Sequence, residues 1–256
     1  MVPCMDVARA RSFGCVAQAY DRARASYPPA AVEWVLEHCG TGAGTRVLDL
    51  GAGTGRLSAV LLDMGVEVVA VEPDDAMRAL VPVGAQALSG TAEQVPLPDG
   101  SVDAVMVGQA WHWFDHEQAL AQVRRVLRPG GVLGLLWNVF DDRVPWVAKL
   151  ADAAAAEDRL SATDDETPYG GEPVPERREF AHSQAMTPDL LVDNLTSRSK
   201  IVLMDPAERE DLLRRVRDVA PADAFDLPWV CDTWRAQMPP PPDRGTPHGS
   251  ARSRVS

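Results

Sequence analysis

The sequence has no long hydrophobic run. Its longest apolar stretches, such as Val132–Trp137, are far shorter than the roughly 20 residues that a helix needs to cross a bilayer. The first residues include arginines but lack the apolar core of roughly 7–15 residues that marks a secretory signal. We therefore expect no membrane association and a cytoplasmic protein.

The chain also has few cysteines and no excess of positive charge. The chain has four cysteines that lie far apart without a Cys-x-x-Cys pair: Cys4, Cys15, Cys39 and Cys231. This spacing predicts neither a zinc site nor a disulfide framework, and we expect no bound metal. The formal net charge of -12 at pH 7 repels a phosphate backbone, so no nucleic-acid partner is expected.

The remaining composition is that of a folded globular protein. Hydrophobic residues make up 46% of the 256 residues and charged residues 24%, which separates the chain from disordered sequences. This length is sufficient for one domain with a full core and a small added lobe.

Short β-type runs alternate with helix-type runs between Arg46 and Trp137. The predicted strands are Arg46–Leu50, Val66–Val71, Ala85–Gly90, Val102–Val107 and Val132–Trp137. Helices are predicted between them at residues 56–65, 74–81 and 115–127. The strand runs are apolar on both faces, as a buried parallel sheet requires, so the pattern predicts an α/β fold with helices covering the sheet.

The ends of the chain are organised differently from this central region. We expect an N-terminal helical cap over residues 1–40 and a main domain over 41–237, with a helical insertion at about 145–220. Strands are also predicted at 178–186 and 227–236. The Pro/Gly/Ser-rich tail at 238–256 has no periodicity and is predicted to be disordered.

The stretch VLDLGAGTGRL (Val47–Leu57) carries the clearest chemical signal. Its glycines give the pattern Gly-x-Gly-x-Gly and not the Gly-x-Gly-x-x-Gly of a dinucleotide loop, because position 56 is Arg. Glycine permits positive φ and a close approach of a ligand to the backbone. Asp49 comes just before the loop and would repel a phosphate, so a ligand with a cationic group suits the loop better.

A second acid, Glu72, ends the second predicted strand. A carboxylate about twenty residues after the loop accepts two hydrogen bonds from a ribose diol in dinucleotide folds. Together the two acids describe a nucleoside that carries positive charge and no phosphate. S-adenosylmethionine fits that description.

Four segments resemble the ordered motifs of class I S-adenosylmethionine-dependent methyltransferases. They are VLDLGAGTGRLSAVL, VVAVEPDDAM, GTAEQVPLPDGSVDAVMVGQAWHWFD and VRRVLRPGGVLGLLW. The resemblance covers roughly residues 13 to 142. Within the class, the motifs are most similar to the small-molecule branch that includes ubiquinone/menaquinone-type and trans-aconitate-type enzymes. The resemblance implies a Rossmann-like fold with a mostly parallel seven-stranded sheet flanked by helices. It also implies methyl transfer to oxygen, nitrogen or carbon of a small molecule, with release of S-adenosylhomocysteine.

The resemblance further implies the roles of individual residues toward the cofactor. Asp49 would lie near its amino group, Glu72 would bind the ribose hydroxyls, and Gln109 would lie beside the sulfonium. The remaining cofactor-binding positions are Gly51, Gly53 and Gly55 in the loop and Thr91, Ala92 and Glu93 at the adenine. Many relatives carry Asp where this chain has Thr91.

The candidate catalytic residue is His112, which follows the fourth predicted strand. Its unperturbed pKa near neutrality would let it remove a proton from an acceptor hydroxyl. Alternatively, it bonds a backbone carbonyl and orients the loop. Its neighbours Trp111 and Trp113 either wall a substrate site or fill the core. Methyl transfer needs alignment and exclusion of water, so a dedicated base is optional.

The N-terminal segment supplies three further candidates for substrate binding. Tyr20, Arg24 and Tyr27 are spaced by four and three residues, so they share a face if this stretch is helical. In relatives such a segment covers the cofactor pocket, which implies that Arg24 pairs with a carboxylate of cofactor or substrate. The alternative is an ordinary packing helix.

We expect the protein to be a monomer or a homodimer. The sequence leaves two other functions open. A cofactor-binding protein without catalysis would keep Asp49 and Glu72. A nicotinamide-dependent dehydrogenase is disfavoured by Arg56 and by the acid before the glycines.

Overall fold

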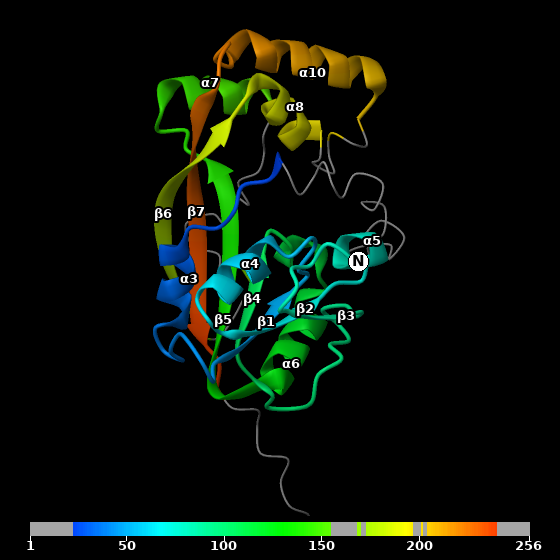
Figure 1. The fold of residues 1–256 in the computed structure, drawn as a ribbon, viewed down its shortest axis with the longest axis vertical. Helices are drawn as coiled ribbons and strands as arrows, with labels where there is room; N and C mark the ends of the chain where they lie inside the picture. Colours follow the sequence, from blue (N-terminus) through cyan, green and yellow to red (C-terminus); the bar gives the residue numbers. More distant parts are fainter. Residues whose placement is uncertain (1–22, 155–167, 170–172, 197–200, 202–203, 240–256) are drawn as a thin grey trace, which may run out of the picture.

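The fold is built on one seven-stranded sheet in the order β3-β2-β1-β4-β5-β7-β6 (Figure 1). The computed structural model describes residues 23–154, 168–169, 173–196, 201 and 204–239. The strands are β1 (Arg46–Leu50), β2 (Glu67–Val71), β3 (Gln86–Leu88), β4 (Val102–Gly108), β5 (Leu127–Phe140), β6 (Glu176–Met186) and β7 (Phe225–Gln237). The first five run parallel, and β7 lies antiparallel between β5 and β6. The predicted mostly parallel α/β sheet is therefore confirmed.

Most predicted strands appear close to their expected bounds, and β5 is the main difference. Its pairing begins at Leu127, directly after the preceding helix, and continues to Phe140. The Pro129–Gly131 segment therefore does not separate the helix from the strand but belongs to the strand. The register of β5 against β4 shifts between Val102 and Ala104, which accommodates this irregular start.

Helices cover both faces of the central strands and create two apolar cores. One core holds residues of α3 (Pro29–Leu36) and α4 (Arg56–Asp63) against the sheet. The other holds the apolar side of α6 (His116–Val126). The short helix α5 (Asp75–Arg78) begins at Asp74, whose carboxylate accepts from the N–H groups of Ala76 and Met77. The strands are apolar on both faces because each face packs against helices.

A third apolar core lies beyond the carboxyl end of β5, where Figure 1 shows helices above the sheet. They are α7 (Pro145–Ala153), α8 (Pro188–Thr196) and α10 (Pro206–Val219). Phe140 of β5 and Trp229 of β7 contribute to this core, with ring centroids 4.7 Å apart. The strand predicted at 178–186 within the insertion is confirmed as β6, which forms an edge of the main sheet.

More than half of the expected N-terminal helical cap, residues 1–22, lies outside the described residues. Within them Ala23 is helical, residues 24–28 are irregular, and α3 begins at Pro29. Met238, where the tail is predicted to begin, is buried and donates its N–H to the carbonyl of Gly131, and residues 240–256 lie outside the described residues. Cys39 and Cys231 are free thiols, while Cys4 and Cys15 lie outside the described residues.

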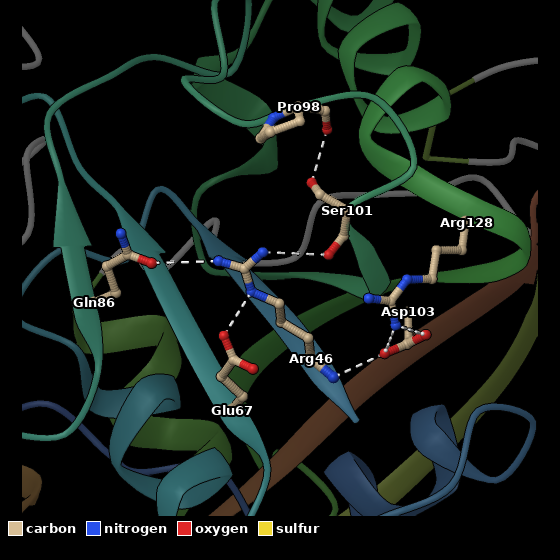
Figure 2. Close-up of polar contacts among 7 residues, drawn as sticks. All are labelled: Arg46, Glu67, Gln86, Pro98, Ser101, Asp103 and Arg128. Carbon is tan, nitrogen blue, oxygen red and sulfur yellow. Dashed lines mark hydrogen bonds and ion pairs between the residues drawn. The ribbon is translucent and has the colours of Figure 1, made fainter. Parts of the chain in front are cut away.

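Polar contacts tie the strands together at the amino end of β1 (Figure 2). The backbone N–H of Arg46 donates to Asp103 over 2.8 Å, and its guanidinium contacts Glu67 at 2.8 Å. Arg128 adds hydrogen bonds of 2.6 and 2.8 Å to the two oxygens of Asp103. This network lies at the edge opposite to the glycine loop, so it supports the sheet without contributing to that loop.

No helix in the described part of the chain has the length and apolarity to span a bilayer.

Candidate functional site

The site is centred on the carboxyl ends of β1 and β4, where the order of the sheet reverses. The chain that follows β1 leads outward through β2 to β3, and the chain that follows β4 continues to β5 on the other side. Loops leaving such a switch point in opposite directions open a crevice, which is the usual ligand-binding edge of an open α/β sheet. The glycine loop follows β1, and Gln109 follows β4.

The glycine loop adopts a conformation that depends on glycine. Gly51, Gly53 and Gly55 have φ values of 72°, 57° and 82°. A Cβ at Gly55 would lie 2.5 Å from the Cδ of Pro82, and one at Gly51 would lie 2.9 Å from the Cβ of Ala110. The close approaches at these two positions are therefore to protein atoms, whereas a Cβ at Gly53 would meet only the sulfur of Met77, at 3.7 Å.

Glu72 joins the end of β2 to the glycine loop. One carboxylate oxygen accepts from the N–H of Gly53 and the other from the N–H of Asp74, both at 2.9 Å. The residue is 7% exposed, and burial raises its pKa while the hydrogen bonds and Arg78 lower it. Each oxygen has two lone pairs, so both remain able to accept a ligand hydroxyl.

Asp49 lies beneath the loop with 1% of its surface exposed. It accepts a hydrogen bond of 2.6 Å from the hydroxyl of Ser58 in α4. The pKa of Asp49 is raised to about 7, mainly by burial and in smaller part by the Glu72 carboxylate, against the hydrogen bonds from Ser58, which lower it. Two buried carboxylates at this edge, one of which raises the pKa of the other, favour a cationic ligand.

The segment from Thr91 to Glu93 follows β3 and contributes to the same core as α6. Ala92 is 3% exposed and belongs to the core, whereas Thr91 and Glu93 are half-buried. The carboxylate of Glu93 accepts from the N–H of Asp115, the residue that caps α6. This side chain therefore holds the beginning of α6.

Gln109 has an unusual backbone conformation. Its φ of 57° is the one positive value among the described residues other than glycine. Its N–H donates to the carbonyl of Leu136 at 2.9 Å, and its side-chain amide donates to the carbonyl of Asn138 at 2.8 Å. A residue held in this region is strained, and such residues concentrate at functional sites.

The two tryptophans after β4 have different surroundings. Trp111 is 1% exposed, donates its indole N–H to the carbonyl of Pro168 at 3.0 Å and stacks on His116. This placement favours the core alternative for Trp111. Trp113 is half-buried, with its ring 4.9 Å from that of His112.

His112 lies in the 3-10 turn η2 (Trp111–Trp113) with part of its ring exposed at the surface. The loss of hydration around the rest of the ring, together with the charges of Arg24 and His116, lowers the pKa of His112 to about 4. The ring is therefore neutral at pH 7 and can accept a hydrogen bond. A base with so low a pKa takes up a proton weakly, which favours the orienting role.

The predicted N-terminal candidates do not form one helical face. Arg24 and Tyr27 lie in the irregular segment before α3, and Tyr20 lies outside the described residues. Tyr27 is 7% exposed, and a Cβ at Gly108 would come within 2.4 Å of its hydroxyl oxygen. The tyrosine therefore lies directly over the end of β4.

Two residues of the site escaped the sequence reasoning. Asn138 is 4% exposed at the carboxyl end of β5 and carries hydrogen bonds to three segments, and Ser58 is fully buried against Asp49. Asn138 directly follows an apolar run, so the rule that selects polar residues at strand ends would have found it. Among the described residues no three His, Cys, Asp or Glu side chains form a group able to hold a metal ion.

Comparison with known proteins gives a consistent result. A family model for a methyltransferase domain matches residues 48–135. Uncharacterized methyltransferases of Mycobacterium bovis and Mycobacterium tuberculosis are each 41% identical over 243 residues, covering 89% of this chain and 96% of each relative. A malonyl-[acyl-carrier protein] O-methyltransferase of Serratia marcescens is 36% identical over 128 residues, covering 46% of this chain and 50% of that protein.

Solved structures with the same fold include two from bacteria. A putative type II methyltransferase from Anaeromyxobacter dehalogenans has a TM-score of 0.60 at 24% identity, covering 85% of this chain and 99% of that one. A putative methyltransferase from an antibiotic biosynthesis pathway of Anabaena variabilis has a TM-score of 0.57 at 25% identity, covering 82% and 96%.

Proposed function

Because this chain belongs to the class I S-adenosylmethionine-dependent methyltransferases, we propose that it methylates an oxygen, nitrogen or carbon atom of a small molecule and releases S-adenosylhomocysteine. The family excludes the dehydrogenase alternative. The observation that carries the proposal is the pair of buried carboxylates, Asp49 and Glu72, beside a glycine loop at the switch point of the sheet.

These residues fit a positively charged nucleoside. Glu72 is held by the N–H groups of Gly53 and Asp74, so its remaining lone pairs point at a fixed position where ribose hydroxyls can donate. Asp49 supplies negative charge beneath the loop for an ammonium group. A pyrophosphate would be repelled by both carboxylates.

The other cofactor contacts follow from the positions of the loops. We assign the methionine part to Gly51, Gly53 and Gly55, although the last is covered on one side by Pro82. The adenine is assigned to the segment from Thr91 to Glu93, mainly through its backbone. Gln109 is assigned to the sulfonium end, because it directly follows β4 at the carboxyl edge of the sheet and has a strained backbone.

Bound S-adenosylmethionine supplies a methyl group that is already activated by the positive sulfur. The chain's own task is to align an acceptor in line with that group and to exclude water. Tyr27, lying over Gly108, can cover the crevice, and Trp113 and His112 lie on the loop that leaves β4. We assign the acceptor site to these residues together with Arg24, whose positive charge reaches His112.

The acceptor is proposed to be a small molecule. The one relative named here by its reaction is an O-methyltransferase, and it matches about half of this chain. A net charge of -12 disfavours nucleic acid as an acceptor. We propose that the protein acts as a monomer or a homodimer in the cytoplasm, without a metal.

A thermal-shift experiment tests the proposal first. S-adenosylmethionine, S-adenosylhomocysteine and NADH are each added at about 100 times a typical dissociation constant, which stabilises a binding protein by roughly 2.7 kcal/mol and raises its Tm by a few degrees. We expect shifts with the first two compounds and none with NADH. A shift with NADH alone would overturn the assignment of the loop. Release of S-adenosylhomocysteine in the presence of candidate acceptors then identifies the reaction.

Glu72→Gln tests the placement of the ribose. A hydrogen bond to a charged acceptor contributes roughly 1.5–3 kcal/mol, so we expect the Kd for S-adenosylmethionine to rise about 10- to 150-fold. Glu67→Gln is the matched control, because Glu67 lies at the opposite end of the same strand and is 63% exposed. Calorimetric titration of both variants, with their Tm values, separates lost binding from lost folding. Equal affinity in the two variants contradicts the placement.

A further inference from the structure

The side chain of Asn138 connects three segments that are far apart in the sequence. Its amide nitrogen donates to the carbonyl of Ser26 at 3.0 Å, and its amide oxygen lies 2.9 Å from the Nε2 of His182 in β6. Since the amide nitrogen faces a carbonyl, the oxygen is the atom that faces His182 and the imidazole N–H donates to it. Its own backbone carbonyl accepts from the side chain of Gln109.

Two other side chains also hold the segment that Asn138 contacts. The carbonyl of Ala23 accepts from Asn194 of α8 at 2.8 Å and from Gln184 of β6 at 3.3 Å. The segment has no regular structure of its own between Arg24 and Pro28. Side-chain donors from β5, β6 and α8 therefore bind its carbonyls, and the donor from Asn138 binds the residue next to Tyr27.

The same residue also acts on the strained turn after β4. Gln109 keeps its positive φ while its backbone N–H and its side chain bond to two carbonyls of β5, those of Leu136 and Asn138. A shift of Asn138 would therefore move the covering segment and the turn together. These are the two parts of the chain that we assign to the acceptor and to the sulfonium.

We infer that Asn138 is a positioning residue for methyl transfer: it holds the Ser26–Tyr27 backbone and the Gln109 side chain in one fixed relation across the crevice. The inference deepens the proposed function and rests on it. Asn138 is not proposed to touch the reacting atoms. It acts through the segment and the turn, whose misplacement by about 1 Å can slow a reaction by 10²-fold.

The test compares Asn138→Ala and Asn138→Asp with Asp103→Asn. The aspartate variant keeps an acceptor for His182 but loses the donor to Ser26. The Asp103 control weakens hydrogen bonds at the opposite edge of the sheet, from Arg46 and Arg128. All assays are run below the measured Tm of every variant, so that each protein is folded.

We expect both Asn138 variants to lower kcat by about 10- to 100-fold while the Kd for S-adenosylmethionine changes less than about threefold. The Asp103 control should change neither value. Hydrogen–deuterium exchange without acceptor should be faster over residues 23–28 in the Asn138 variants alone, because both variants lose the side-chain donor to Ser26 but keep the backbone carbonyl that binds Gln109. Unchanged exchange there overturns the inference, as does a fall in kcat no larger than in the control. Failure of the wild type to release S-adenosylhomocysteine with any acceptor would instead count against the proposed function, since the exchange result needs no turnover.

Discussion

Asp49 makes the binding of a cationic cofactor depend on pH. Its carboxylate is buried, and its pKa of about 7 leaves it about half protonated at neutral pH. Its pKa lies about 3 above the value of 3.8 for a free aspartate, and each pKa unit corresponds to 1.36 kcal/mol. Ionising Asp49 in the folded chain therefore requires about 4 kcal/mol more than ionising a free aspartate. A cation bound beside it favours the ionised form, so binding should release a proton.

The size of the effect follows from this pKa. If only the ionised form binds well, the Kd for S-adenosylmethionine should be about tenfold higher at pH 6 than at pH 8. Binding should release about 0.9 proton at pH 6 and about 0.1 at pH 8. Calorimetric titration in two buffers with different ionisation enthalpies measures these values. In the absence of cofactor, the contribution of Asp49 to folding stability should fall as pH rises from about 4 to 7, because the folded state binds the proton more tightly there.

Two variants control this prediction. Asp49→Asn should remove the proton release attributed to this group and flatten the pH dependence of Kd. Ser58→Ala removes the 2.6 Å hydrogen bond that stabilises the carboxylate, so the midpoint should move to higher pH. The reasoning is refuted if wild type and Asp49→Asn release equal amounts of proton at pH 6.

Two further predictions concern the loops. In denaturant unfolding, Gly55→Ala should destabilise the protein by about 1–3 kcal/mol more than Gly65→Ala. Both glycines have positive φ, but only at Gly55 would the added Cβ lie 2.5 Å from a neighbouring atom, the Cδ of Pro82. Equal losses of stability would contradict the close approach. His112→Ala should lower kcat less than tenfold, and the pH profile should show no inflection from this residue near neutrality, because its pKa is about 4; a loss of 10²–10⁴-fold would identify it as the base.

Much of the sheet could be predicted from local sequence. The strands that begin at Arg46 and Val102 are bounded as the apolar runs indicated, and the helix capped by Asp115 begins where expected. These features depend on nearby residues: an apolar run for a buried strand and a capping carboxylate for a helix. Residues far along the chain have little influence on them.

Local sequence patterns did not predict the conformation or burial of residues whose surroundings come from distant segments of the chain. The spacing of Arg24 and Tyr27 permits a helix, but Asn138, Gln184 and Asn194 instead hold the nearby carbonyls in an irregular segment. Trp111 follows a strand end, as a residue facing substrate would, yet it is buried. Neither outcome is encoded within a few residues of the position concerned.

The sequence by itself determined the glycine loop and placed Asp49 and Glu72 at the ends of two strands. The spacing of small, acidic and apolar residues is a local property, and parallel strands bring their carboxyl ends to one edge. Only the tertiary structure decided that Asp49 is buried against Ser58, that His112 is a weak base, and that Asn138 joins three segments. A pKa and a hydrogen-bond network depend on which atoms surround a group after folding, and those atoms come from distant parts of the chain.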